Sequence, residues 1–554
     1  MITLTLYNGE IRQVPKGSTL LPLALEFAKE FSSPIVEGVF NGETIDLQAP
    51  LQEDGTVDFI ELKSEDGMRV YVRTLLFLFI VTSKKLYPDV EVEVHNTLGS
   101  ALHCVFKGEN KLSAKALKLI EAEMRKLVEE KTPINLLRMI KAEAVEKYGH
   151  LCNEDLAPLL CNISDEAFVN VYTLCDRAGY LFGAMCPNAG YITDFKLMPF
   201  EEGIILDYPN FSDWKELVNF KDLTKLNAAF RESEEWAERI KCDTISKLNN
   251  YIEQGVADKI VQMAEALHEK KFAAIADEIA KHRDKIKIIL IAGPSSSGKT
   301  SSTQRISIQL AVNGIRPIPI SMDDYYVNRV DTPRKPNGDY DFETVDAIDL
   351  ELFNAHLKRL LNGERVKIPK YNFQTGLREY RGNELQLTEN SVLLVEGIHG
   401  LNDKLTAAIP AENKIKIYVS ALIPLAFDQY NRINTTDVRL LRRMVRDSQF
   451  RSHDALETLK RWPDVREGEE KYIFPFQCSA DVIMNTNLIY EMAVIKKYAE
   501  PLLEAVPREA GKPYMIARRL LRLLKHVKSM EDDVIPNNSL LREFIGGSVF
   551  KEAL

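Results

Sequence analysis

Residues 286–302 have the sequence IKIILIAGPSSSGKTSS, and this stretch decides the fold of the C-terminal half of the chain. The segment IKIILIA is almost entirely apolar and rich in β-branched residues, which is typical of a strand buried on both faces of a sheet. It leads into residues 293–300, which match the pattern GxxxxGK[ST], and the following SSTQRISIQLAVN predicts a helix. A strand, a glycine-containing loop and a helix in this order predict a phosphate-binding P-loop in an α/β domain with a parallel sheet.

The residue types in this loop suit a nucleoside triphosphate. Gly293 and Gly298 permit backbone angles that aim successive amide N–H groups at phosphate oxygens, and the N-terminus of the next helix adds a positive dipole. The Lys299 ammonium can reach the β- and γ-phosphates, and the Thr300 hydroxyl can ligate Mg²⁺. The alternative is an ordinary glycine turn before a helix. The predicted nucleotide-binding residues are Gly293, Pro294, Ser295, Ser296, Ser297, Gly298, Lys299, Thr300 and Ser301.

Two acidic positions follow other predicted strands. The strand at 391–395 ends in Glu396, which can hold Mg²⁺ directly or through water; the alternative is a capping residue in a strand-to-loop turn. The strand at 318–322 delivers Asp323 and Asp324, and a kinase needs a carboxylate beside the attacking hydroxyl to accept its proton. If this stretch is extended, only one of the two points into the site. The alternative is a solvated acidic turn.

A basic helix is predicted over residues 437–447, DVRLLRRMVRD. Its arginines recur at threes and fours, so one helix face carries much of the positive charge. Guanidinium groups suit a phosphoryl group in transit because they offer fixed, planar donors to its oxygens. The alternative is a solvated face whose arginines pair with Asp437 and Asp447. The arginines are Arg439, Arg442, Arg443 and Arg446.

Seven segments together resemble the uridine kinase/phosphoribulokinase family, and uridine–cytidine kinases in particular. They are LIAGPSSSGKTSS, PISMDDYY, YDFETVDAIDL, IPKYNFQTGLRE, VLLVEGIHGL, DVRLLRRMVRD and SADVIMNT, in this order. The resemblance covers residues 286–505 and implies a kinase that uses ATP and Mg²⁺. It also implies that an assembly of identical chains could form.

This resemblance assigns roles to individual residues. It makes Asp323 the general base, Asp341 the carboxylate that holds ribose hydroxyls, and the basic helix a lid over the transferring phosphate. The implied catalytic residues are Lys299, Asp323, Arg443 and Arg446. The implied acceptor-binding residues are Tyr326, Tyr340, Asp341, Tyr371, Arg378 and Arg443. The implied metal ligands are Thr300 and Glu396.

The chain departs from the family at two positions. Gly376 stands where the family has a histidine that contacts the nucleobase, and His453 replaces an arginine just after the lid helix. Arg378 and Arg451 remain where the family has basic residues. We therefore expect phosphate-transfer machinery with an altered base pocket.

The first 62 residues alternate apolar and polar side chains. Strands are predicted at 2–6, 11–14, 35–40 and 57–62, with a turn at Asn8-Gly9. Ser18 is predicted to cap a short helix that runs to about Phe27. This α+β pattern resembles the TGS domain, a β-grasp module at the start of threonyl-tRNA synthetases. Residues 63–211 resemble the synthetase's second, editing-type domain.

The editing-like region lacks the residues that editing needs. That synthetase domain carries an HxxxH pair and a CxxxH pair, but this chain has Arg73 and Phe77 at the first and Cys186 and Gly190 at the second. Arginine and phenylalanine cannot replace two imidazoles as neutral nitrogen donors. We expect Cys186 to be a packed thiol and the region to be a binding or regulatory scaffold.

Composition limits the remaining possibilities. The 554 residues carry a net charge of −10, which disfavours a polyanion-binding molecule, and seven cysteines without a CxxC pair favour a reducing compartment. The most apolar run, at 75–81, is far shorter than the ~20 residues of a membrane span, and the N-terminus has no signal-peptide pattern. We therefore expect a cytoplasmic protein without membrane contact.

The predicted organisation has five parts: a TGS-like β-grasp domain (1–62), a synthetase-like α+β domain (63–211), a helical connector (212–284), a P-loop kinase domain (285–505) and a helical tail (506–554). We expect an ATP- and Mg²⁺-dependent kinase that phosphorylates the 5′-hydroxyl of a nucleoside. The nucleoside expected is uridine or cytidine. One alternative is the same chemistry on a purine nucleoside, a sugar phosphate or a polyol. Another is an RNA- or tRNA-sensing regulatory protein whose P-loop is a switch.

Overall fold

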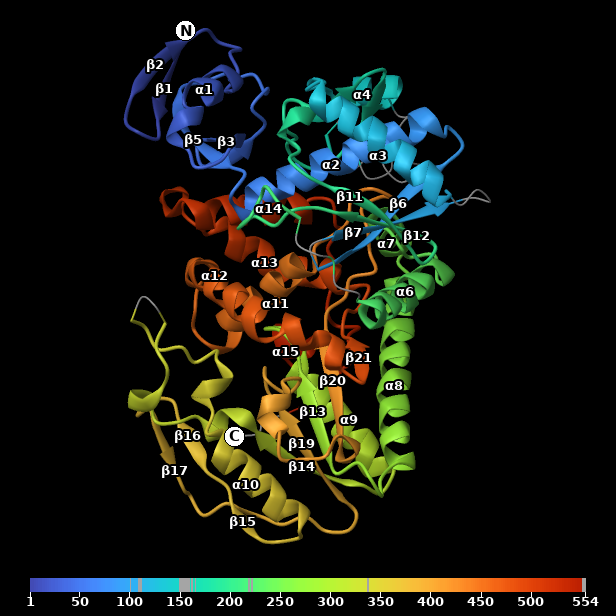
Figure 1. Ribbon diagram of the computed structural model, residues 1–554, viewed down its shortest axis with the longest axis vertical. Helices are drawn as coiled ribbons and strands as arrows, with labels where there is room; N and C mark the ends of the chain where they lie inside the picture. Colours follow the sequence, from blue (N-terminus) through green and yellow to red (C-terminus); the bar gives the residue numbers. More distant parts are fainter. Residues whose placement is uncertain are drawn as a thin grey trace.

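The computed structural model describes residues 1–99, 101–107, 112–148, 160, 163–164, 166–217, 220, 223–335 and 338–550. The molecule is elongated, with the N-terminal elements at one end and the P-loop sheet at the other (Figure 1). Within the described residues, no helix is both long enough and apolar enough to cross a bilayer. The five described cysteines are thiols, whereas Cys152 and Cys161 lie outside the described residues.

The N-terminal unit is a five-stranded sheet in the order β2-β1-β5-β3-β4, in which β1 and β5 are parallel. The alternating residues Ile2, Leu4 and Leu6 are buried in its core, as their period predicts. The one α-helix, α1 (Leu21–Glu26), begins after Leu20 without a side-chain cap, so the prediction that Ser18 caps it is wrong. The strands are β1 (Ile2–Leu6), β2 (Ile11–Val14), β3 (Ile35–Phe40), β4 (Glu43–Ile45) and β5 (Gly55–Glu61).

The second unit contains two antiparallel sheets, in the orders β10-β9-β8 and β11-β12-β7-β6. Helix α2 (Glu65–Leu86) contains the apolar run 75–81, which is buried throughout. Ser113 accepts a hydrogen bond from Ala116 N and so caps α3 (Ala114–Glu129). The other elements are β6 (Glu91–Leu98), β7 (Ala101–Lys107), β8 (Ile134–Ile140), α4 (Lys141–Tyr148), β9 (Phe168–Leu174), β10 (Arg177–Gly179), β11 (Lys196–Phe200) and β12 (Gly203–Asp207).

Three helices precede the P-loop sheet: α6 (Thr224–Arg239), α7 (Ile245–Glu253) and α8 (Ala257–Lys281). The long helix α8 lies beside α9 (Lys299–Val312), the helix that follows the P-loop (Figure 1). Buried Arg305 on α9 pairs with Glu269 on α8 at 2.6 Å and with Glu265 at 3.4 Å. These ion pairs fix the P-loop helix to the preceding helical segment.

The C-terminal half is built on a five-stranded parallel sheet in the order β14-β19-β13-β20-β21. The all-apolar strand β13 lies at its centre and is completely buried, as its composition predicts. The strands are β13 (Ile288–Ala292), β14 (Arg316–Ser321), β19 (Ser391–Glu396), β20 (Lys414–Ser420) and β21 (Val482–Asn485).

Shorter elements follow β14 in the chain. They are α10 (Leu350–Leu361), the paired strands β15 (Val366–Lys367) and β18 (Glu384–Leu385), and the hairpin β16 (Lys370–Asn372) and β17 (Leu377–Glu379). Apolar residues of α10 and β15 pack in one core with residues of β13, β14 and β19. The remaining helices are α11 (Thr435–Phe450), α12 (Ala455–Tyr472), α13 (Glu491–Glu504), α14 (Lys512–Leu524) and α15 (Arg542–Ile545).

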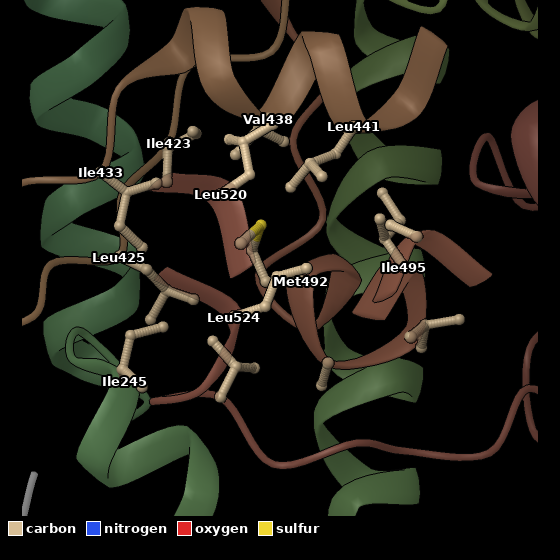
Figure 2. Packing of buried hydrophobic residues seen from close by; sticks show 14 of the residues in the cluster. Ile245, Ile423, Leu425, Ile433, Val438, Leu441, Met492, Ile495, Leu520 and Leu524 are labelled. Atoms are coloured by element: carbon tan, nitrogen blue, oxygen red, sulfur yellow. The ribbon is translucent and has the colours of Figure 1, made fainter. Parts of the chain in front are cut away.

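One large apolar core joins four of these helices. Figure 2 shows Val438 and Leu441 of α11 packed with residues of α7, α13 and α14, among them Met492 and Leu524. We expected helix α11 to be a lid. Its apolar face is packed in this shared core. Only its other face is available to the P-loop.

Candidate active site

The sheet places three functional segments side by side. In the strand register, Glu396 at the end of β19 pairs with Ile291 of β13 on one side and with Ser321 of β14 on the other. The P-loop begins two residues after Ile291, and Asp323 lies two residues after Ser321. Because carboxyl ends of parallel strands share one edge of a sheet, all three segments meet there.

The P-loop has the strained, close-packed backbone that its sequence predicts. A Cβ on Gly293 would lie 2.0 Å from the carbonyl oxygen of Val419, and Gly298 has φ +83°. Ser296 also adopts a positive φ of 57°. Nζ of Lys299 donates to the carbonyl oxygens of Gly293 (2.8 Å) and Pro294 (3.0 Å), so the lysine folds back over its own loop. Burial lowers the pKa of Lys299.

Thr300 and Glu396, the two predicted metal ligands, lie in direct contact. The Thr300 hydroxyl donates to Oε1 of Glu396 at 2.9 Å. Burial raises the pKa of Glu396, and the nearby Lys299 ammonium opposes that rise. Two hard oxygen donors fit Mg²⁺, which takes its other ligands from phosphates and water. Over the described ranges, no group of three or more His, Cys, Asp or Glu side chains is arranged to hold a metal without such help.

Asp323 and Asp324 lie in a 3₁₀ turn at Met322–Tyr325, so this stretch is not extended. The turn separates the two carboxylates. Asp324 lies 3.4 Å from Nζ of Lys370 and accepts a hydrogen bond from Tyr371 N. Asp323 remains accessible to solvent.

The electrostatic surroundings of Asp323 connect it to the P-loop. Desolvation by the surrounding protein raises the pKa of Asp323, and the Asp324 carboxylate raises it further. Among the groups that lower this pKa, the Lys299 ammonium has the largest effect. Asp323 is thus a solvent-accessible carboxylate within the field of the P-loop lysine.

Asp341 is held by both carboxylate oxygens. Oδ1 accepts from the amide of Glu343 at 3.2 Å, and Oδ2 accepts from the hydroxyl of Tyr472 at 2.9 Å. Tyr472 ends α12, whose sequence gave no signal of this role. The two bonds fix the direction in which Asp341 presents its remaining lone pairs.

Aromatic side chains gather between Asp323 and the β16–β17 hairpin. The ring of Tyr371 lies 5.5 Å from that of Tyr326 and 5.0 Å from that of Phe373, both edge-to-face. Tyr326 donates from its hydroxyl to the carbonyl oxygen of Phe342. The Tyr371 hydroxyl is buried without a hydrogen-bond partner. Two of the predicted acceptor-binding residues, Tyr326 and Tyr371, are thus in ring contact with each other and with Phe373.

Two other predicted acceptor residues have local partners. The guanidinium of Arg334 lies 4.2 Å from the ring centre of Tyr340 and donates to its hydroxyl at 3.0 Å. Arg378 forms a 2.7 Å ion pair with Asp349, the residue that caps α10. Arg378 therefore braces the hairpin against this helix.

The four arginines of α11 lie on one helix face, toward the P-loop, as their spacing predicts, but they divide into two pairs by burial. Arg439 and Arg442 are fully buried. Nε of Arg439 donates to the carbonyl oxygen of Ser295, and Nη1 of Arg442 donates to that of Ser296. Their charges are matched by Glu469 and Glu491. This pair supports the P-loop backbone.

Arg443 and Arg446 lie on the same face of α11 but are only half-buried. Nη1 of Arg443 donates to Oγ of Ser295 at 2.8 Å. Burial lowers the pKa of Arg446 to about 10, and its Nη1 lies 3.8 Å from Glu543. Of the four arginines, these two have the exposure that contact with a phosphate requires.

One of the two departures from the family, Gly376, has a local explanation. Gly376 has φ +72°, and a Cβ there would lie 2.8 Å from the side chain of Arg329. A histidine at this position would be strained and would collide with that arginine. His453 lies 3.8 Å from Glu457 in the next helical turn.

The editing-like region holds a packed interior where the synthetase has ligands. A Cβ on Gly183 would lie 2.7 Å from the guanidinium carbon of Arg73, which donates to the carbonyl oxygen of Ala184. Cys186 is fully buried, and burial raises the pKa of its thiol to about 12.

Residues 288–489 match the family model of the Phosphoribulokinase / Uridine kinase family. The C-terminal half therefore contains a domain of this family. The chain is also 18% identical to a candidate fructose transport system kinase from Silicibacter sp. TM1040, over 38% of this chain and 98% of that one, with a TM-score of 0.27. A candidate uridine kinase from Bacillus stearothermophilus is 22% identical, over 26% of this chain and 78% of that one, with a TM-score of 0.21.

The N-terminal region matches threonine–tRNA ligases. The ligase of Desulforamulus reducens is 25% identical over 198 residues, which make up 36% of this chain and 31% of the ligase. The chain thus spans about a third of the length of the curated relatives that it matches.

Proposed function

We propose that the chain transfers the γ-phosphoryl group of ATP to the 5′-hydroxyl of a nucleoside, with uridine and cytidine as the first acceptors to test. The observation that carries this proposal is the strand register that brings the P-loop, Glu396 and Asp323 to one edge of the sheet. Family membership of the domain supports a phosphotransferase that acts on a small-molecule hydroxyl.

Asp323 would orient the acceptor hydroxyl and take its proton. Its raised pKa makes the ionised carboxylate a better proton acceptor than an ordinary aspartate. Lys299 would exchange its bonds to the loop carbonyls for bonds to phosphate oxygens. Arg443 and Arg446 would offset charge on the transferring group and exclude water.

Thr300 and Glu396 would hold Mg²⁺, which supplies charge neutralisation across the β- and γ-phosphates when it is bound. The hydrogen bond between them brings both oxygens together already. Arg439 and Arg442 would keep the loop amides directed at the phosphates.

A nucleoside acceptor is supported by Asp341 and the aromatic residues beside it. A fixed carboxylate can accept hydrogen bonds from two ribose hydroxyls, and Tyr326, Tyr371 and Phe373 offer ring surfaces to a base. A second acceptor class, a sugar phosphate or polyol, is favoured by Gly376, which leaves no imidazole for a nucleobase at that turn.

An acceptor panel with γ-labelled ATP tests this proposal on the full chain. It should contain uridine, cytidine, adenosine, guanosine, a pentose phosphate and glycerate, with Lys299→Ala as the inactive control. We expect labelled uridine or cytidine monophosphate from the wild-type chain only. Label on a sugar or polyol with both pyrimidine nucleosides unmodified would exclude the nucleoside assignment.

A further inference from the structure

A carboxylate from the C-terminal segment occupies the start of the P-loop helix. Oε2 of Glu543, on α15, accepts hydrogen bonds from the amide of Ser301 at 3.1 Å and from its hydroxyl at 2.7 Å. The amide lies in the first turn of α9, where a helix has N–H groups without intrahelical partners. Such groups, directly after the GK[ST] residues, are the donors that a P-loop offers to a phosphate.

The second oxygen of the same carboxylate faces α11. Oε1 of Glu543 lies 3.8 Å from Nη1 of Arg446. Glu543 thus bridges a P-loop amide and hydroxyl on one side and an arginine of α11 on the other. This set of donors is one that an anionic phosphate would use.

Another glutamate provides an instructive contrast. Oε1 of Glu469 accepts from the P-loop amide of Ser295 at 2.9 Å, but this side chain is 3% exposed and is paired with fully buried Arg439. Removing Glu469 from its position would leave a buried arginine without its counter-charge. The Glu543 side chain is 15% exposed, as is that of Arg446, so this pair can separate at lower cost.

The segment around Glu543 is anchored independently of its carboxylate. Leu540 is fully buried against Gly298, and the ring of Phe544 lies 5.0 Å from the guanidinium of Arg442. Leu541 is also fully buried in the shared core. A rotation of the Glu543 side chain can therefore free the phosphate donors while the apolar residues stay in place.

We propose that Glu543 is a built-in competitor of the nucleotide: its carboxylate holds a phosphate position on Ser301 and Arg446, and a nucleoside triphosphate must displace it. This inference rests on the proposed nucleotide-binding function. Because only the fraction of molecules with the carboxylate displaced can bind, Glu543 lowers the apparent affinity for nucleotide. Arg446 passes from Glu543 to the phosphate when the nucleotide enters.

The test compares nucleotide affinity of the full-length chain with that of Glu543→Gln and Glu543→Ala. Titration calorimetry with ATP is run with Mg²⁺ and with a chelator, without any acceptor. Asp533→Asn is the matched control, because it removes an exposed acid from the same segment. We expect both Glu543 variants to bind ATP more tightly than the wild-type chain, by on the order of tenfold, with Mg²⁺ and with the chelator. This factor corresponds to the free energy of one charge-assisted hydrogen bond.

Thermal melting without nucleotide supplies a second readout. We expect Glu543→Gln to melt lower than the wild-type chain when nucleotide-free and to gain more from added MgATP. Equal affinities of the wild-type chain and both variants would overturn this inference alone. Weaker binding by the variants only when Mg²⁺ is present would make Glu543 a metal ligand and would also overturn it. If none of the chains binds ATP, the proposed function fails together with this inference.

Discussion

The hydroxyl of Thr300 donates a 2.9 Å hydrogen bond to Oε1 of Glu396, across the boundary between two neighbouring strands of the sheet. Thr300 lies in the first turn of α9, the helix after the P-loop, and Glu396 ends strand β19. Their contact depends on the strand register, since a shift of one residue would turn Glu396 to the other face of the sheet.

Glu396→Gln should raise the Mg²⁺ concentration required for half-maximal turnover by about tenfold or more, because a neutral amide binds Mg²⁺ more weakly than a carboxylate. The measurement is turnover against Mg²⁺ at saturating ATP. Glu412→Gln, at an exposed position near β20, is the control. An unchanged Mg²⁺ requirement would remove Glu396 from the metal site.

Asp323→Asn should reduce kcat by roughly 10²- to 10⁴-fold while ATP affinity stays close to that of the wild-type chain, because it removes the proton acceptor but no phosphate contact. Asp324→Asn is the matched variant in the same turn, and it should keep most of the activity because Asp324 is engaged with Lys370. A normal rate for Asp323→Asn combined with a large loss for Asp324→Asn would show that Asp324, and not Asp323, is the general base.

The raised pKa of Asp323 gives two further expectations. Turnover should fall as the pH drops through this pKa, which lies above the ordinary value for aspartate, and the acid limb should be absent in the residual activity of Asp323→Asn. A raised folded-state pKa contributes stability only at low pH, and this contribution is lost as the pH rises through it. Above this pKa the charged Asp323 therefore costs stability, and Asp323→Asn should melt higher than the wild-type chain there.

Tyr472→Phe should raise KM for the acceptor roughly three- to tenfold with little change in kcat or in KM for ATP, because it removes one of the two hydrogen bonds that orient Asp341. Tyr251→Phe, which removes a hydroxyl from α7 far from the acceptor region, is the control. A proportional loss in the kinetics of both substrates would indicate a general structural role.

Glu469→Gln should lower the free energy of unfolding by about 3 kcal/mol, because it leaves Arg439 buried without its counter-charge. Denaturant unfolding at neutral pH measures this change. Glu467→Gln, in the same helix but exposed, should change stability by less than ~0.5 kcal/mol. The double variant Arg439→Met with Glu469→Leu should recover part of the loss.

The sequence was sufficient to predict the central part of this fold because the relevant signals are local. The unbroken apolar run before Gly293 predicted the buried strand β13, and the glycine spacing predicted the P-loop backbone. The acidic residues at the ends of β14 and β19 could be placed together because parallel strands share one carboxyl edge. Their proximity needed only the order of elements.

The remaining features depend on contacts between segments far apart in the chain. Arg439 and Arg443 both donate to Ser295, yet Arg439 is fully buried and Arg443 is partly exposed. Arg439 is paired with Glu469, 30 residues away in the chain, and no local pattern indicates that contact. Glu543 lies in LLREFIGG, which contains no local pattern that indicates contact with Ser301. Tyr472 is inconspicuous for the same reason.

The shared core of α7, α11, α13 and α14 has a practical consequence for dissecting this protein. Leu425 and Ile433 pack in the same core as Ile245 of α7, so a fragment beginning at residue 285 would expose part of that surface to water (Figure 2). Such a fragment would tend to aggregate. A loss of catalysis in it would then result from the exposed apolar surface and would not show that a catalytic group is missing. Point substitutions in the intact polypeptide are therefore the sounder route to separating the contributions of its two halves.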